Sequence, residues 1–186
     1  MVSKKNSGWR PCGDYKRLSL ITVLDRYPIP LISDAMNNIA GCTVFSVIDL
    51  KAGFNQIPMD PAEVPKTAVI TPFGLFEWLQ MPFGLMNSCC MFQRKMHEVL
   101  GESPFIFCYV DDMLVASRTI QEHKVHLREV FNCLRWAQLT VNIDKSTLAR
   151  PSVEFLGQKV DSEGIGGHPA SEGEGKHHPP VPSPHE

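Results

Sequence analysis

The chain has 186 residues, 43% of them hydrophobic and 20% charged, which is the composition of a globular protein and excludes a wholly disordered chain. Its formal net charge is −2, so overall charge neither indicates nor excludes a polyanionic partner. No segment approaches the ~20 consecutive apolar residues of a membrane helix, and the first residues lack the apolar core of a signal peptide. Six cysteines without a CxxC spacing favour free, mostly buried thiols. We therefore expect a soluble intracellular protein, in the cytoplasm or the nucleus.

The first elements follow a polar and basic N-terminal stretch. Basic residues gather in the first 17 positions, namely Lys4, Lys5, Arg10, Lys16 and Arg17. The stretch closes on "DRYPIP", whose prolines favour extended backbone. Ser33 is expected to cap a short helix over residues 34–40, which Gly41 ends. The β-branched, mostly apolar run over residues 43–50 predicts a buried strand.

Two hairpins and a helix are predicted next. Turn signals at residues 72–74 and 82–84 predict a hairpin within residues 67–85. Residues 88–100 have a helical pattern that ends at glycine 101. A second hairpin is expected over residues 105–117, "FIFCYVDDMLVAS", where two apolar runs flank two aspartates.

A second long helix and a last pair of strands complete the pattern. Thr119 and Glu122 form a capping-box signal in front of a one-sided apolar stripe that we expect to be core. The stripe consists of Ile120, Leu127, Val130, Phe131 and Leu134. Residues 153–160 are expected to form the strand pair.

Three aspartates are expected to meet at one edge of a sheet. The order of elements predicts an α+β fold, a split β-α-β-β-α-β antiparallel sheet with helices on one face. In such a sheet the strand end at Asp49 can lie beside the hairpin tip that carries Asp111 and Asp112. Clustered carboxylates repel each other unless a cation lies among them, and oxygen ligands of this kind suit Mg²⁺. The pattern therefore predicts a metal site for phosphoryl or nucleotidyl transfer.

An ordinary hairpin tip is the alternative reading of Asp111 and Asp112, because aspartate is a common turn residue. The usual two-residue hairpin signal is Asn-Gly or Asp-Gly, in which glycine supplies a positive φ. Met113 follows Asp112 here, so turn chemistry alone does not explain the pair.

A set of motifs in fixed order resembles the reverse transcriptase of gypsy-type long-terminal-repeat retrotransposons. The motifs are "WRPCGDYKRL", "DRYPIP", "FSVIDLKAGFNQI", "PKTAVITPFGLFEW", "MPFGLMNS…FQR", "YVDD" and "VEFLGQKVDSEGI". They cover roughly residues 4–165, and the set is far more specific than "YVDD" alone. The resemblance implies an RNA-directed DNA polymerase with a right-hand fold, of which this chain holds part of the fingers and most of the palm.

The resemblance also implies a catalytic mechanism and its partners. Asp49, Asp111 and Asp112 are similar to the catalytic triad that holds two Mg²⁺ ions, or Mn²⁺ in their place. These ions would activate a primer 3′-hydroxyl and neutralise charge on the transferred α-phosphate. The implied partners are an RNA or DNA template with its primer strand, and deoxynucleoside triphosphates. No membrane is expected, and the oligomeric state is left open.

Further site residues are assigned by resemblance only. The nucleotide-binding set is Arg10, Lys5, Phe54, Phe83, Gly84, Tyr109 and Lys145, and the primer grip is Phe155, Leu156 and Gly157. Arg10 would contact the triphosphate, and Lys4 or Lys5 would make a second cationic contact. Phe54 would be the steric gate against a ribose 2′-hydroxyl, although its residue pattern alone favours an ordinary core position. Lys145 matches loosely a lysine that protonates pyrophosphate.

Three parts are expected along the chain: a partial fingers segment over residues 1–42, a palm over residues 43–165 with an inserted fingers hairpin at about 60–87, and a disordered tail over residues 166–186. The tail is rich in Gly, Pro and His, and out-of-frame translation is one hypothesis for it. Without a thumb and the first part of the fingers, a second function stays open. That alternative is a catalytically incompetent retrotransposon remnant that acts at most as a nucleic-acid-binding module.

Overall fold

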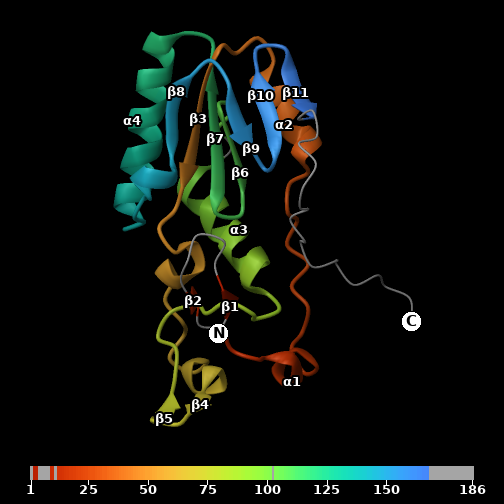
Figure 1. Cartoon of the computed structure of the whole chain (residues 1–186), viewed down its shortest axis with the longest axis vertical. Coiled ribbons are helices and arrows are strands. Elements are labelled where there is room, and N and C mark those ends of the chain that lie inside the picture. The colour runs from red at the N-terminus through yellow and green to blue at the C-terminus, as the bar shows by residue number, and fades with distance from the viewer. Residues whose placement is uncertain (1, 4–8, 11, 102, 168–186) are drawn as a thin grey trace, which may run out of the picture.

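The computed structural model describes residues 2–3, 9–10, 12–101 and 103–167 (Figure 1). A larger part, at the top of Figure 1, contains the main sheet, and a smaller part at the bottom carries α1 (Lys16–Ser19) and a short hairpin. That hairpin consists of β4 (Val69–Thr71) and β5 (Gly74–Phe76), as the sequence predicted. The predicted tail from residue 168 onward lies outside the described residues.

The main sheet has four antiparallel strands in the order β6-β7-β3-β8. Its strands are β3 (Val44–Asp49), β6 (Ile106–Tyr109), β7 (Asp112–Ser117) and β8 (Thr147–Arg150). The connections run through α3 (Ser88–Leu100) between β3 and β6, and through α4 (Ile120–Trp136) between β7 and β8. This order is the split β-α-β-β-α-β layout that the sequence predicted. Central strand β3 therefore has partners on both sides.

Helices α3 and α4 cover one face of this sheet. Alternate strand residues point to opposite faces, so Ile48 and Val115 join the helices in one core. From the helices, Phe92 and Met96 of α3 and Leu134 of α4 are at most 1% exposed. Burying a side chain of this size stabilises the fold by about 1.5–3 kcal/mol, so this layer fixes α3 against the sheet.

The opposite face is covered by a smaller second layer. It contains α2 (Ile32–Ile39) and an antiparallel sheet in the order β11-β10-β9. The strands are β9 (Val153–Phe155), β10 (Gln158–Asp161) and β11 (Gly164–Gly167). Phe45, Leu114 and Phe155 lie in this second core. The prediction of helices on one face thus holds for α3 and α4, while α2 lies on the other side, to the right in Figure 1.

Short elements complete the described chain. They are β1 (Val2–Ser3), β2 (Trp9–Arg10) and the 3₁₀ helices η1 (Gly53–Gln56), η2 (Val64–Thr67) and η3 (Ile143–Lys145). Helix α1, strand β8 and strand β11 were not predicted, since none has a clear apolar period. Strand β11 extends to Gly167, so it includes the first two residues of the segment 166–186 that was expected to be disordered.

One helix start differs from the prediction. Helix α2 begins at Ile32 with Leu31 as its N-cap residue, so the prediction of Ser33 as the cap is wrong. The reason is that the Asp34 carboxylate accepts the Leu31 N–H at 2.9 Å and satisfies the first turn from within the helix.

At α4 the predicted cap is confirmed, because Thr119 Oγ1 accepts the Glu122 N–H at 3.2 Å. The Glu122 carboxylate, however, accepts the Arg118 N–H rather than that of Thr119. The prediction of Ile120 as a core residue is wrong, because it is 39% exposed at the helix start. Val130 and Leu134 are buried as predicted.

No disulfide joins the six cysteines, all of which belong to the described residues. Cys42 and Cys108 are buried as expected, whereas Cys12 and Cys89 are exposed, Cys89 in the first turn of α3. In the described part of the chain, no helix combines the length and the apolar character needed to cross a membrane.

Candidate active site

Asp49 and Asp112 face each other across two neighbouring strands. Asp49 ends β3, Asp112 begins β7, and the antiparallel register pairs them directly. Directly opposite residues in such a ladder point to the same face of the sheet. By alternation this is the face of Phe45 and Leu114, away from α3 and α4. Both carboxylates are half-buried, so they remain accessible at the edge of the second core.

Residues 109–112, called here the aspartate turn, connect β6 to β7. Tyr109 pairs with Asp112, which leaves Val110 and Asp111 as a two-residue hairpin loop. Val110 has φ +56°, and Asp111 does not have a positive φ, a sign pattern that matches a type II′ turn. Glycine is the usual residue at the first of these positions, and a β-branched residue there costs on the order of 1–3 kcal/mol. The turn is therefore strained.

Gly53 makes room for the side chain of Asp111. A Cβ atom at Gly53 would lie 3.0 Å from Asp111 Cβ and 3.1 Å from Asp111 Oδ2. Gly53 begins η1, four residues after Asp49, so the Asp111 carboxylate lies beside the connection that leaves β3. The structure thus places Asp112 opposite Asp49 and Asp111 beside the connection that follows Asp49, so all three lie near the end of β3.

The backbone of Asp49 is held by a segment far away in the sequence. The Asp49 N–H donates to Ser146 Oγ at 3.1 Å, and the Asp49 carbonyl accepts the Asn142 N–H at 2.8 Å. Leu50 forms an isolated bridge with Val141. No local sequence pattern marks Ser146 or Asn142 as a partner of Asp49, because both lie far from it along the chain, Ser146 by 97 positions.

The three carboxylates fit a hard divalent cation but do not form a finished binding site. Among the described residues, no group of three or more His, Cys, Asp or Glu side chains is close enough to hold a metal ion. The donors at this edge are all carboxylate oxygens, which suit Mg²⁺ because it keeps several waters and needs only one or two carboxylates. The site is therefore an open acidic edge.

Phe54 lies between this edge and the helix-side core. Its ring contacts Phe83 at 5.2 Å and Phe92 at 5.2 Å between centroids, both in edge-to-face geometry. Phe54 is half-buried and directly follows Gly53, against which the Asp111 carboxylate lies. The position of Phe54 is thus compatible with both predicted roles, an ordinary core residue and a steric gate, since the ring packs on the core and also lies near the aspartates.

The loop at Phe83 and Gly84 packs against the N-terminal segment. Gly84 has φ +96°, and a Cβ there would lie 3.1 Å from the Gly13 carbonyl oxygen. The Cys12 thiol also approaches the Phe83 carbonyl, at 3.8 Å. The segment just after Arg10 therefore lies against the loop of Phe83 and Gly84, whose Phe83 ring contacts Phe54. The side chain of Arg10 and the whole of Lys5 lie outside the described residues.

The other predicted residues are more distant or more buried. Lys145 is exposed at the end of η3 and precedes Ser146, which bonds to Asp49. Phe155 is 1% exposed and packs edge-on against Phe107, so its side chain belongs to the second core. The turn between β9 and β10 contains the rest of the predicted primer grip, Leu156 with φ +51° and Gly157 with φ +78°.

Sequence similarity to known proteins extends over most of this chain. Residues 2–160 match the family described as "Reverse transcriptase (RNA-dependent DNA polymerase)". The retrovirus-related Pol polyprotein from transposon opus of Drosophila melanogaster is 40% identical over 163 residues, which are 87% of this chain. Polyprotein P3 of Commelina yellow mottle virus is 38% identical over 79% of the chain. The chain spans only 16% and 8% of the length of these two proteins.

Solved structures with the same fold include foamy viral protease–reverse transcriptases. One, in complex with double-stranded DNA, superposes with a TM-score of 0.84 at 29% identity and covers 90% of this chain and 30% of that one. Another, in complex with an RNA/DNA hybrid, has a TM-score of 0.78 at 29% identity and covers 84% of this chain and 21% of that one. From the matched family, the relatives and the shared fold, we conclude that this chain belongs to the reverse transcriptase (RNA-dependent DNA polymerase) family.

Proposed function

We propose that this chain is the catalytic part of a polymerase that adds deoxynucleotides to a primer 3′-hydroxyl on an RNA or DNA template. The observation that carries the proposal is the acidic edge, where Asp49 lies opposite Asp112 and Asp111 lies against Gly53. Membership of the reverse transcriptase family supports the reaction class. The solved relatives in complex with an RNA/DNA hybrid and with double-stranded DNA support the nucleic-acid partner.

The proposed reaction is a displacement at phosphorus. The primer 3′-oxygen forms a bond to the α-phosphorus of the incoming nucleotide, the bond to pyrophosphate breaks, and the hydroxyl proton passes to water. Divalent metal ions, when bound, lower the charge repulsion in this step and activate the hydroxyl. Within this chain Asp49 and Asp111 would hold them, with Asp112 in support. Both the two-metal arrangement and the preference for Mg²⁺ belong to the proposal.

The position of Phe54 supports a preference for deoxyribose over ribose in the incoming nucleotide. Its ring is fixed by Phe83 and Phe92 beside the residue that makes room for Asp111. A rigid ring at that place would leave no room and no polar partner for a ribose 2′-hydroxyl, so we propose deoxynucleoside triphosphates as substrates. We also propose that the protein acts inside the cell, since its six free cysteines are compatible with a reducing compartment.

Primer extension tests the proposal directly. The purified chain, with Mg²⁺ and a primed RNA or DNA template, is expected to extend the primer, and Asp111→Asn is expected to abolish the extension. The matched control is Asp144→Asn, which removes an equal charge from an exposed position on η3. Equal extension by Asp111→Asn and the unmodified chain would contradict the assignment. Primer–template binding without extension by the unmodified chain would instead favour the nucleic-acid-binding alternative.

A further inference from the structure

A buried glutamine of α3 bonds to the strained aspartate turn. Gln93 is 0% exposed, its Oε1 accepts the Val110 N–H at 2.7 Å, and its Nε2 donates to the Cys108 carbonyl at 3.0 Å. A backbone N–H can only donate, so the side-chain oxygen must face Val110 and the side-chain nitrogen must face Cys108. One side chain therefore ties the strand before the turn to the residue with φ +56°.

The same amide fixes the tautomer of a neighbouring histidine. Gln93 Nε2 lies 3.0 Å from His97 Nε2, and this nitrogen has a second hydrogen to donate after its bond to Cys108. His97 Nε2 must then be the acceptor and carry no hydrogen. A neutral His97 ring therefore carries its proton on Nδ1, which donates to the Tyr27 hydroxyl oxygen at 2.7 Å. The three side chains form one ordered chain of hydrogen bonds.

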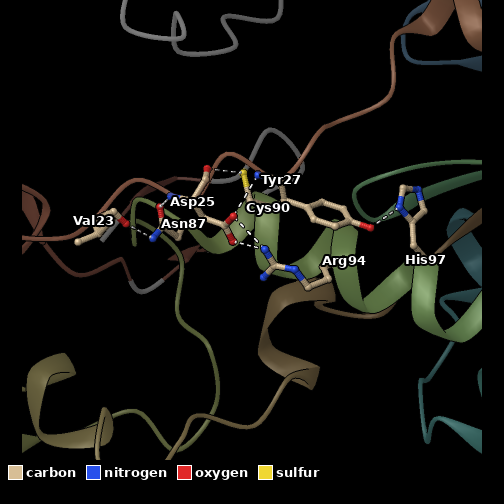
Figure 2. Close-up of polar contacts among 7 residues, drawn as sticks. All are labelled: Val23, Asp25, Tyr27, Asn87, Cys90, Arg94 and His97. Carbon is tan, nitrogen blue, oxygen red and sulfur yellow. Dashed lines mark hydrogen bonds and ion pairs between the residues drawn. The ribbon is translucent and has the colours of Figure 1, made fainter.

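Tyr27 is itself anchored to α3 by a set of polar contacts (Figure 2). The Arg94 guanidinium lies over the Tyr27 ring, 4.7 Å from its centroid. One Arg94 nitrogen donates to both oxygens of Asp25 at 2.9 and 2.8 Å, and Asp25 Oδ1 accepts the Tyr27 N–H at 3.0 Å. Asn87 adds two bonds, from its Nδ2 to the Val23 carbonyl at 2.8 Å and from the Asp25 N–H to its Oδ1 at 3.1 Å.

We propose that Tyr27, His97 and Gln93 act as positioning residues for the aspartate turn, linking the extended segment around Asp25 to the placement of Asp111. This inference rests on the proposed function, because it concerns the same carboxylates. A strained turn persists only where its surroundings determine it, and Gln93 supplies two bonds there, in addition to the Cys108 thiol, which donates to the Val110 carbonyl at 3.4 Å. Replacing a residue that orients a metal ligand without binding the metal itself typically weakens metal affinity about 10- to 100-fold.

The experiment compares two variants with two matched controls in this chain. We call the hydrogen-bonded chain of Tyr27, His97 and Gln93 the relay. Gln93→Met keeps the length of the side chain and removes its polar bonds, and Tyr27→Phe removes the hydroxyl at the end of the relay that is farthest from the aspartate turn. Val99→Ala shortens another buried side chain of α3, and Tyr15→Phe removes a tyrosine hydroxyl that bonds instead to the Thr67 carbonyl. The measurements are the ¹⁵N spectrum of the His97 ring, the amide resonances of the aspartate turn, and calorimetric titration with Mg²⁺.

The relay predicts that His97 in the unmodified chain is protonated on Nδ1 and not on Nε2. Gln93→Met should release this tautomer, shift the Val110 and Asp111 amides, and weaken Mg²⁺ binding about 10- to 100-fold. Tyr27→Phe should shift the same resonances by less, and the two controls should leave the tautomer unchanged even where Val99→Ala lowers stability. A proton on His97 Nε2, or unchanged turn resonances in Gln93→Met, would overturn the relay. If the unmodified chain binds no Mg²⁺, the proposed metal site fails, and the two spectroscopic measurements still decide the relay.

Discussion

Replacing Asp49 by asparagine should stabilise the metal-free protein. The side chain keeps its shape and loses one negative charge directly opposite Asp112. Two unit charges about 5 Å apart repel by about 0.8 kcal/mol in water, and like charges opposite each other in a ladder cost up to about 1 kcal/mol. The bonds that Asp49 makes to Ser146 and Asn142 use its backbone, so the substitution leaves them in place. We expect the unfolding free energy to rise by about 0.5–1 kcal/mol in chelator.

Added Mg²⁺ should reverse the order of the two proteins. A ligand that binds only the folded chain stabilises it by about 1.4 kcal/mol at ten times its Kd. For a chain of this length, 1 kcal/mol moves the Tm by about 2–4 °C. The unmodified chain should therefore gain about 3–6 °C with Mg²⁺, and Asp49→Asn, which has lost a ligand, should gain much less.

Thermal unfolding followed by circular dichroism, with chelator and across a Mg²⁺ titration, measures both effects. Asp144→Asn serves as the control, because it removes the same charge from an exposed position and should respond to Mg²⁺ like the unmodified chain. An equal Mg²⁺ response of Asp49→Asn and the unmodified chain would refute the placement of the metal at this edge. A variant clearly less stable than the unmodified chain in chelator would refute the argument from repulsion.

Three further predictions concern single side chains. In a polymerase that contains this chain, Phe54→Val should raise ribonucleotide incorporation relative to deoxynucleotide incorporation, and an unchanged ratio in primer-extension assays would return Phe54 to a purely structural role. Burial, with a smaller contribution from His126, lowers the pKa of His123, so the unfolded chain takes up its proton at higher pH than the folded protein does. The urea unfolding free energy should thus decline as pH falls through about 6.5, and a flat pH profile in that range would contradict a neutral buried His123. Burial raises the pKa of the Cys108 thiol and also, with Cys90 and Asp111, that of Cys89, so exposure decides the outcome: alkylation of the native protein should label exposed Cys12 and Cys89 and leave buried Cys108 unmodified, as peptide mass spectrometry can check.

The parts of the fold that sequence could predict are those with a local signal. The strand that ends at Asp49 and the helix Ser88–Leu100 have runs of apolar residues with clear stops, and both were found close to their true bounds. Asp111 and Asp112 became candidates for the site because an acidic pair between two buried strands is unusual. Gln93 was missed, since a glutamine on a helix normally lies at the surface, and only tertiary packing buries it.

Strand β8 was missed for a related reason. Its four residues, Thr147–Arg150, are all exposed, so they have no alternation of apolar and polar side chains to detect. Its pairing with β3 is also irregular, with a register shift between Phe45 and Val47. Residues 147–150 form a strand only because they pair with β3, and a pairing with so distant a segment cannot be read from the local sequence.

The support of Asp49 by Ser146 and Asn142 has a consequence for synthesis on the ribosome. Ser146 follows Asp49 by 97 positions, and at about 5–20 residues per second it is added about 5–20 s later. During that interval one edge of β3 lacks its partner β8 and exposes backbone groups that can pair with other chains. The nascent chain therefore passes through an aggregation-prone stage in which its acidic edge is incomplete, so its yield should depend on chaperones that bind within those seconds.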